Sequence, residues 1–150
     1  MTPSEYQNPI LCADYSDPDI VRVGDDFFMV SSSFNHVPAL PILHSTDLVN
    51  WTIINHVMDE LPLPGYDRYQ PGKGVWAPSI RWHDGKLWVC FSTPDEGIFI
   101  CHTEDPWGKW SAPHCLREAR GWIDPCPFWD DNGQAWLVHA FAHSRSGIKH

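Results

Sequence analysis

The sequence predicts an all-β fold made of repeated antiparallel strand pairs, and three observations carry this prediction. The 150 residues include 9 Trp, 7 Phe and 4 Tyr together with 14 Pro and 10 Gly, a mixture typical of short strands joined by sharp turns. Three turn signatures are each flanked by runs of β-forming residues. No stretch keeps an apolar period of 3.6 residues over three helical turns.

The turn signatures divide the chain into three predicted hairpins. The turns lie at 24–26, 83–86 and 130–133, where the sequence reads GDD, HDGK and DDNG, and glycine, aspartate and asparagine tolerate the positive φ of tight turns. Several flanking runs are almost wholly apolar, which is typical of strands buried on both faces. In chain order, the strands before and after the three turns are predicted at 20–23 and 27–30, 79–82 and 87–91, and 127–129 and 135–138.

A proline stands at the same place before each hairpin. The residue before this proline is Asp17 in the first repeat, Ala77 in the second and Asp124 in the third. From that residue to the first residue after the turn, the chain advances by ten, ten and eleven positions (17 to 27, 77 to 87, 124 to 135). Such a constant spacing indicates a repeated structural unit.

A second element repeats between the hairpins. The segment HSTD at 44–47 leads to Trp51, and HTED at 102–105 leads to Trp110, so these copies lie 58 residues apart (44 to 102), against 60 for the first two proline motifs (17 to 77). Four antiparallel strands repeating at about 45–60 residues are typical of β-propeller blades. We expect both tryptophans to pack within the blades.

The length is short for a whole propeller. Propellers close with about 4–8 blades, whereas the repeat here starts at 17, 77 and 124 and gives two blades and part of a third. An open propeller exposes sheet surfaces that should be packed. We therefore expect residues 1–150 to be the N-terminal part of a single longer propeller domain, or to be completed by other copies of the chain.

Composition excludes several classes of partner. With 10 Lys+Arg against 19 Asp+Glu and a net charge of -9, the chain lacks the basic patches that nucleic acids and anionic membranes require. No apolar run approaches the ~20 residues of a membrane span. Five cysteines, an odd number without a CxxC pair, indicate neither disulfides nor a zinc site. These thiols and the absence of a visible secretion signal predict a cytoplasmic location.

The proline repeat places two carboxylates together. The first strand of each blade lines the central channel of a propeller, so Asp17 and Asp124 should point into one shared cavity. Buried carboxylates that face each other separate in pKa, which suits acid–base chemistry. An aspartate before proline can instead cap a turn, but two at equivalent positions beside aromatic clusters favour a functional role. Asp19 is a weaker candidate, because strand alternation specifies its environment only in part.

Several motifs in order resemble the opening of glycoside hydrolase family 43, over essentially the whole chain. These are NPIL at 8–11, DYSDPDI at 14–20, VGDDFF at 23–28, HSTDLVNW at 44–51, VWAPSI at 75–80 and GWIDP at 121–125. The resemblance implies a five-bladed propeller, of which the chain covers roughly the first two and a half blades. It also implies an inverting hydrolase that releases xylose or arabinose from oligosaccharides.

The resemblance implies roles for individual residues. Asp17 matches the general base, and Asp124 matches the aspartate that tunes the pKa of the general acid and orients it. The general acid is a glutamate, and none of the glutamates here lies in a matching motif, so we expect it beyond His150 and expect the isolated chain to be inactive. Phe34 and Trp76 resemble the aromatic walls of the sugar pocket, where the apolar face of a pentose stacks.

Four further expectations complete the predicted site. Asn35 and His36 follow Phe34 in a predicted loop and are candidates for contacts with sugar hydroxyls. Phe34 and Trp76 could instead be core aromatics.

We expect no metal site, because His139 and His143 have no third or fourth ligand near in sequence. The resemblance implies no required cofactor, although some family members hold a cation in the channel.

Other functions compete with pentoside hydrolysis. A non-catalytic carbohydrate-binding propeller would use the same aromatic walls without turnover. A purely structural or protein-interaction propeller would explain the fold but not the two carboxylates. A related propeller hydrolase of fructosides fits the motif series less well. An oligosaccharide is the expected partner, and the oligomeric state stays open.

Overall fold

Residues 5–146 are described by a computed structural model, and their strands form three antiparallel sheets. The first sheet has the order β1 (Asp19–Val23), β2 (Asp26–Val30), β3 (Ala39–Ser45), β4 (Thr52–Met58). The second has the order β5 (Trp76–His83), β6 (Lys86–Thr93), β7 (Gly97–Thr103), β8 (His114–Glu118). The third pairs β9 (Trp122–Trp129) with β10 (Ala135–Phe141), and a one-turn helix, α1 (His143–Ser146), follows. These sheets confirm the predicted all-β fold of two four-stranded blades and part of a third.

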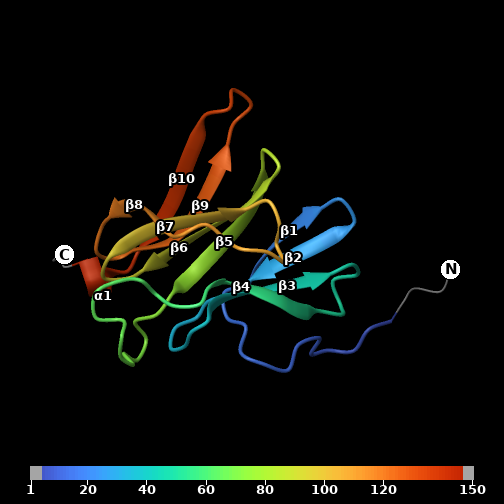
Figure 1. Ribbon diagram of the computed structural model, residues 1–150, viewed down its shortest axis with the longest axis horizontal. Coiled ribbons are helices and arrows are strands. Elements are labelled where there is room, and N and C mark those ends of the chain that lie inside the picture. Colours follow the sequence, from blue (N-terminus) through green and yellow to red (C-terminus); the bar gives the residue numbers. More distant parts are fainter. Residues whose placement is uncertain (1–4, 147–150) are drawn as a thin grey trace.

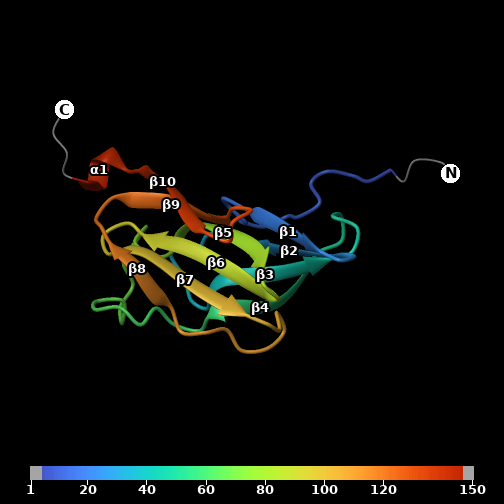
Figure 2. The ribbon, with the colours of Figure 1, turned by 90° about the horizontal axis from the view of Figure 1, so that it is seen from above.

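The first strand of each sheet lies on the inner side of the assembly. β5 packs between β1 and β9, as Figure 1 shows. From above, β1 and β5 lie on one side of their sheets and the outer strands β4 and β8 on the other (Figure 2). The starts of β1, β5 and β9 therefore gather at one end of the inner wall, where the proline motifs stand.

The predicted hairpins are all present. In the β5–β6 hairpin, His83 pairs with Lys86, so the turn consists of Asp84 and Gly85. Both take positive φ, 49° and 73°, as a two-residue hairpin turn requires. The Asp-Gly signature thus determines this register locally.

The core lies between the sheets and is built from their middle strands. Val30 and Ile42 of the first sheet and Val89 of the second are fully buried, as the apolar runs predicted. Cys90 and Cys101 are also buried, and burial raises the pKa of each thiol to about 12. These two cysteines are packing residues of the core.

The two repeated tryptophans pack as expected, but to different extents. Trp110 is buried in the core cluster. Trp51 is half-buried, and its Nε1 donates to Leu48 O at 3.0 Å. Among residues 5–146 no helix is long and apolar enough to cross a membrane.

Polar contacts fasten the inner strands to one another. Asp19 Oδ2 accepts from Ile80 N at 2.8 Å and from Arg81 Nη1 at 2.6 Å, and this joins β1 to β5. Ser79 Oγ donates to Pro125 O at 2.7 Å, which joins β5 to β9. Asp19 therefore has a structural role in the channel wall.

Candidate active site

Asp17 and Asp124 share an unusual backbone conformation. Their φ angles are 51° and 53°, in the left-handed region that aspartate tolerates better than most residues. Backbone conformations of this kind cost energy and gather at functional sites. The repeat therefore reproduces the same local geometry at both carboxylates, just before β1 in the first sheet and near the start of β9 in the third.

A serine that follows the neighbouring strand orients Asp17. Ser32, which comes after β2 and is buried, donates from Oγ to Asp17 Oδ2 at 2.6 Å. The backbone N of Ser32 also donates to Ser16 O at 3.0 Å. This pair of contacts fixes one carboxylate oxygen and the backbone before it, so that the second oxygen keeps a defined direction.

The two carboxylates interact electrostatically. The pKa of Asp124 is raised, first by partial burial of its carboxyl group and second by the negative charge of Asp17. The sequence predicted that both side chains would be buried in a shared cavity. This prediction of burial is wrong for the described residues, because both residues as a whole are solvent-exposed. The reason is geometric, since three inner strands form only part of a channel wall.

An aromatic pair stands between the first two sheets. The rings of Phe34 and Trp76 lie 6.1 Å apart at 72°, edge to face. An antiparallel bridge between Ser33 and Val75 connects the chain segments that carry them. The two predicted sugar-pocket aromatics are thus neighbours although 42 positions separate them (34 to 76).

Gly74 allows this close approach. Its N donates to Phe34 O at 2.8 Å, and a Cβ at this position would stand 2.1 Å from Ser33 O and 2.6 Å from Phe34 O. A side chain does not fit there, because both neighbours are backbone atoms. The contact between the segment after β2 and the start of β5 thus depends on a glycine.

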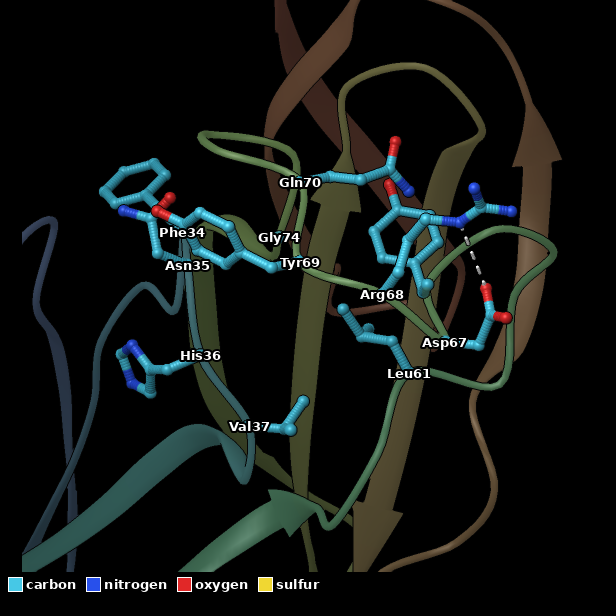
Figure 3. A pocket seen from close by; sticks show the side chains of 11 residues that line it. Phe34, Asn35, His36, Val37, Leu61, Asp67, Arg68, Tyr69, Gln70 and Gly74 are labelled. Carbon is cyan, nitrogen blue, oxygen red and sulfur yellow. Dashed lines mark ion pairs between the residues drawn. The ribbon is translucent and has the colours of Figure 1, made fainter.

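Asn35 and His36 lie beside a cavity, which we call the loop cavity, of about 280 Å³. Its wall is completed by the connection between β4 and β5 (Figure 3). Asn35 Oδ1 accepts from Gly72 N at 2.7 Å, so this side chain ties the loop down as well as lining it. The remaining lining residues are Phe34, Val37, Leu61, Tyr66, Asp67, Arg68, Tyr69, Gln70 and Gly74.

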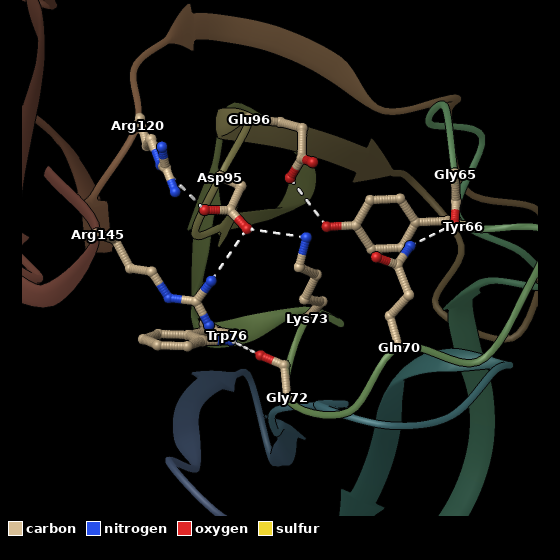
Figure 4. Close-up of polar contacts among 10 residues, drawn as sticks. All are labelled: Gly65, Tyr66, Gln70, Gly72, Lys73, Trp76, Asp95, Glu96, Arg120 and Arg145. Atoms are coloured by element: carbon tan, nitrogen blue, oxygen red, sulfur yellow. Dashed lines mark hydrogen bonds and ion pairs between the residues drawn. The ribbon is translucent and has the colours of Figure 1, made fainter. Parts of the chain in front are cut away.

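A cluster of charges centred on Asp95 holds the same loop from the other side. Asp95 receives Lys73 Nζ at 3.4 Å, Arg120 Nε at 3.2 Å and Arg145 Nη1 at 3.0 Å (Figure 4). Arg145 also lies 5.7 Å over the ring of Trp76. The Asp95 cluster therefore joins the β4–β5 loop, the β6–β7 turn, the β8–β9 connection and α1 behind the aromatic pair.

The Asp95 cluster predicts a pH-dependent contribution to stability. Burial would raise the pKa of Asp95, but Lys73, Arg145 and Arg120 together lower it below its ordinary value of 3.8. A carboxyl group whose pKa is lowered on folding stabilises the protein above its unfolded pKa, and this stabilisation is lost as pH falls through the folded pKa. We expect Asp95→Asn to reduce the free energy of unfolding by about 1–2 kcal/mol at pH 7, a range that allows for the exposed partners.

Urea unfolding at pH 7 and pH 3 measures this effect. The difference in the free energy of unfolding between the parent protein and Asp95→Asn should be smaller at pH 3 than at pH 7. Asp67→Asn is a matched control, because the Asp67–Arg68 pair at 3.8 Å is exposed on both sides and should contribute little. An equal difference in the free energy of unfolding at both pH values would contradict the assigned role of the Asp95 carboxylate.

Sequence reasoning missed the loop-cavity residues and the Asp95 cluster. Residues 59–75 connect β4 to β5 without a strand, and a loop of this length in a compact domain is commonly functional. That length, together with Tyr66 and Tyr69, was the available signal. For Asp95 no local signal exists, since its partners Lys73 and Arg145 lie far away in the sequence.

His139 was one of the two histidines considered as metal ligands, and it packs against an aromatic ring. His139 stacks on Trp122, with ring centroids 3.8 Å apart and an interplanar angle of 15°. Within the described range 5–146 no group of three or more His, Cys, Asp or Glu side chains is placed to hold a metal ion.

Glycosidases act through a pair of carboxyl groups, and this chain carries two, Asp17 and Asp124, at equivalent ends of the inner strands of a partial propeller. The family model for Glycosyl hydrolases family 43 matches residues 6–150, and the chain belongs to this family. The family expectation drawn from the motifs is thereby confirmed.

Individual relatives agree with this assignment. The chain is 42% identical over 137 residues to a xylosidase/arabinosidase of Butyrivibrio fibrisolvens, covering 87% of this chain and 26% of the relative. It is 38% identical to the non-reducing end alpha-L-arabinofuranosidase BoGH43B of Bacteroides ovatus over 127 residues, covering 80% and 23%. The crystal structure of the GH43 BlXynB protein from Bacillus licheniformis superimposes with a TM-score of 0.81 at 31% identity, covering 90% and 29%. The chain thus spans about a quarter of the length of its curated relatives.

Proposed function

We propose that this chain belongs to an inverting glycoside hydrolase that releases xylose or arabinose from xylo- or arabino-oligosaccharides. The observation that carries the proposal is the pair Asp17 and Asp124, which share one backbone geometry and lie near enough for the charge of Asp17 to raise the pKa of Asp124. The names of the relatives support both pentoses, since they include xylosidases and arabinofuranosidases.

In the proposed mechanism Asp17 is the general base. Its carboxylate removes a proton from the water that attacks the anomeric carbon, and Ser32 holds that carboxylate in place. An inverting enzyme keeps its acid and base about 6.5–9.5 Å apart so that this water fits. The proposed chemistry needs carboxyl groups and water, and no cofactor enters it.

Asp124 has a supporting role in this mechanism. Its negative charge would raise the pKa of a neighbouring glutamic acid and keep that acid protonated until it donates to the leaving oxygen. We propose that this glutamate lies in the longer protein, outside residues 1–150. The described glutamates Glu96 and Glu104 are engaged elsewhere, with Tyr66 and Lys86.

We further propose that residues 1–150 form part of one longer propeller domain. Strand β10 pairs only with β9 within residues 5–146, and it exposes Trp136, Val138 and Phe141 at 48%, 58% and 44%. A sheet with an open edge and a large apolar surface is normally covered. A further strand and blade would cover it and enclose the carboxylates.

The test uses the protein expressed from its complete reading frame, with aryl β-xyloside and aryl α-L-arabinofuranoside as substrates. Proton NMR during hydrolysis should show the first-formed sugar with the opposite anomeric configuration to the substrate. Release with the original configuration would contradict the inverting mechanism. Sugar binding by calorimetry without turnover of either substrate would instead identify a non-catalytic carbohydrate-binding propeller.

A further inference from the structure

The middle inner strand carries a guanidinium group between the strands of the two candidate carboxylates. β5 packs against β1 on one side and against β9 on the other (Figure 1). Asp17 comes just before β1, Asp124 lies near the start of β9, and Arg81 belongs to β5. The distance between the two carboxylates is therefore set by how β1 and β9 are held against β5.

The two terminal nitrogens of Arg81 contact opposite strands. Nη1 donates to Asp19 Oδ2 on β1 at 2.6 Å, and Nη2 donates to Cys126 Sγ on β9 at 2.8 Å. Nη1 also donates to Ile80 O at 2.6 Å, which ties the guanidinium group to its own strand. Because a planar guanidinium donates in fixed directions, this one side chain links all three inner strands.

The two partners of Arg81 hold equivalent places in the repeat. Asp19 is two residues after Asp17, and Cys126 is two residues after Asp124. In each repeat the one residue between them is a proline, whose ring fixes φ. A short and stiff connection therefore transmits the position of each partner to the carboxylate beside it.

Arg81 is charged and half-buried where it makes these contacts. Its side chain is 33% exposed, and that of Asp19 is 31% exposed. Partial burial would lower the pKa of Arg81, but the charge of Asp19 and the hydrogen bonds to Asp19 and Cys126 raise it. Partly buried pairs are screened by salt less than exposed ones. Ser79 also ties β5 to β9, through Pro125 O, whereas Arg81 reaches both neighbouring strands.

We propose that Arg81 is a positioning residue, which holds Asp17 and Asp124 at a fixed separation by bridging the strands that carry them. This inference rests on the proposed hydrolase function and extends it, because it assigns the geometry of the carboxylate pair to a residue outside that pair. The separation matters for the chemistry, since a displacement of about 1 Å in an active site can lower a rate about 10²-fold.

Arg81→Lys in the full-length protein tests this bridge. Lysine keeps the positive charge, but its single nitrogen replaces the two that reach Asp19 and Cys126 separately. We expect kcat on aryl pentosides to fall about tenfold to a hundredfold, with little change in KM. The pKa of Asp124, measured by carbon-13 NMR, should move down toward its ordinary value. Both causes of its rise, burial and the charge of Asp17, weaken as β9 moves away from β1.

Control variants separate position from charge and from stability. Arg22→Lys is the matched control, because Arg22 lies on β1 with a side chain that is 64% exposed; it should keep the parent kcat and the parent pKa of Asp124. Cys126→Ala removes only the β9 end of the bridge and should shift both readouts in the same direction as Arg81→Lys, but less. Cys126→Ser keeps an acceptor and should stay closer to the parent than Cys126→Ala. Urea unfolding checks that each variant is folded in the assay.

The outcomes separate this inference from the proposed function. A parent kcat or a parent pKa of Asp124 in folded Arg81→Lys would overturn the positioning role, and a loss of stability alone would make Arg81 a purely structural link. If Arg81→Lys does not fold, Cys126→Ala decides by the same two measurements. If the parent protein turns over no pentoside, the hydrolase proposal fails, and the pKa of Asp124 then decides the positioning role by itself.

Discussion

Asp17→Asn should lower kcat/KM on aryl pentosides by about 10²–10⁴-fold in the full-length protein, the usual contribution of a general base. Asparagine keeps the size of the side chain and its hydrogen bond from Ser32, but its amide cannot take a proton from water. The loss should fall mainly on kcat, because the substitution leaves Phe34 and Trp76, the proposed sugar contacts, unchanged. Steady-state kinetics on both pentosides measures it.

The pKa of Asp124 provides a second readout of the same substitution. Since the charge of Asp17 is one of the two causes that raise this pKa, Asp17→Asn should move it down toward the ordinary value. Carbon-13 NMR of the Asp124 carboxyl group during a pH titration measures the change. This effect arises only if the two carboxylates lie near each other in the folded protein.

A matched control separates the base from a general effect of charge. Asp25→Asn removes one aspartate from an exposed turn, where Asp25 pairs only loosely with Arg22 at 3.5 Å. It should keep the parent rate and the parent pKa of Asp124. Activity of Asp17→Asn within tenfold of the parent protein would refute the role of Asp17 as the base.

Gly74→Ala should be among the most destabilising single substitutions in the chain. The new Cβ would stand 2.1 Å from Ser33 O and 2.6 Å from Phe34 O. Ser33 O accepts from Val75 N, and Phe34 O accepts from Gly74 N, so a shift of either oxygen breaks a backbone hydrogen bond. We expect the free energy of unfolding to fall by about 2–4 kcal/mol. Because Phe34 and Trp76 flank the bridge between Ser33 and Val75, sugar binding should weaken too.

Gly72→Ala in the same loop is the control for Gly74→Ala. Gly72 has φ +68°, and nothing lies within 4 Å of the position that a Cβ would take there, so alanine costs only backbone strain of about 1 kcal/mol. Denaturant unfolding of both variants measures the difference. Equal stability of the two would show that the segment after β2 and the start of β5 can separate at no cost.

The repeat could be predicted because its signals are local. Asp84 and Gly85 favour a two-residue turn through their own φ preferences, and apolar runs favour buried strands wherever they stand. The equivalent positions of Asp17 and Asp124 follow from the same repeat, since identical units place identical positions alike. The exposure of these two carboxylates did not follow, because it depends on how much of the channel wall surrounds them.

The long connection between β4 and β5 shows where sequence reasoning stopped. Its residues have weak preferences of their own, and their places are fixed by contacts with distant segments. Asn35 accepts a hydrogen bond from Gly72, and Asp95 forms an ion pair with Lys73. Asp19 was open to a functional interpretation until its contacts with Ile80 and Arg81 showed that it joins β1 to β5.

The sequence alone determined the all-β repeat, the three hairpins and the equivalent positions of Asp17 and Asp124, since turn preferences and strand periodicity act over a few residues. Only the tertiary structure decided the loop cavity and the charges that hold it. Arg145 and Asp95 are 50 residues apart in the chain yet 3.0 Å apart in space. Contacts of this kind arise from how blades pack on one another, and no local pattern encodes that packing.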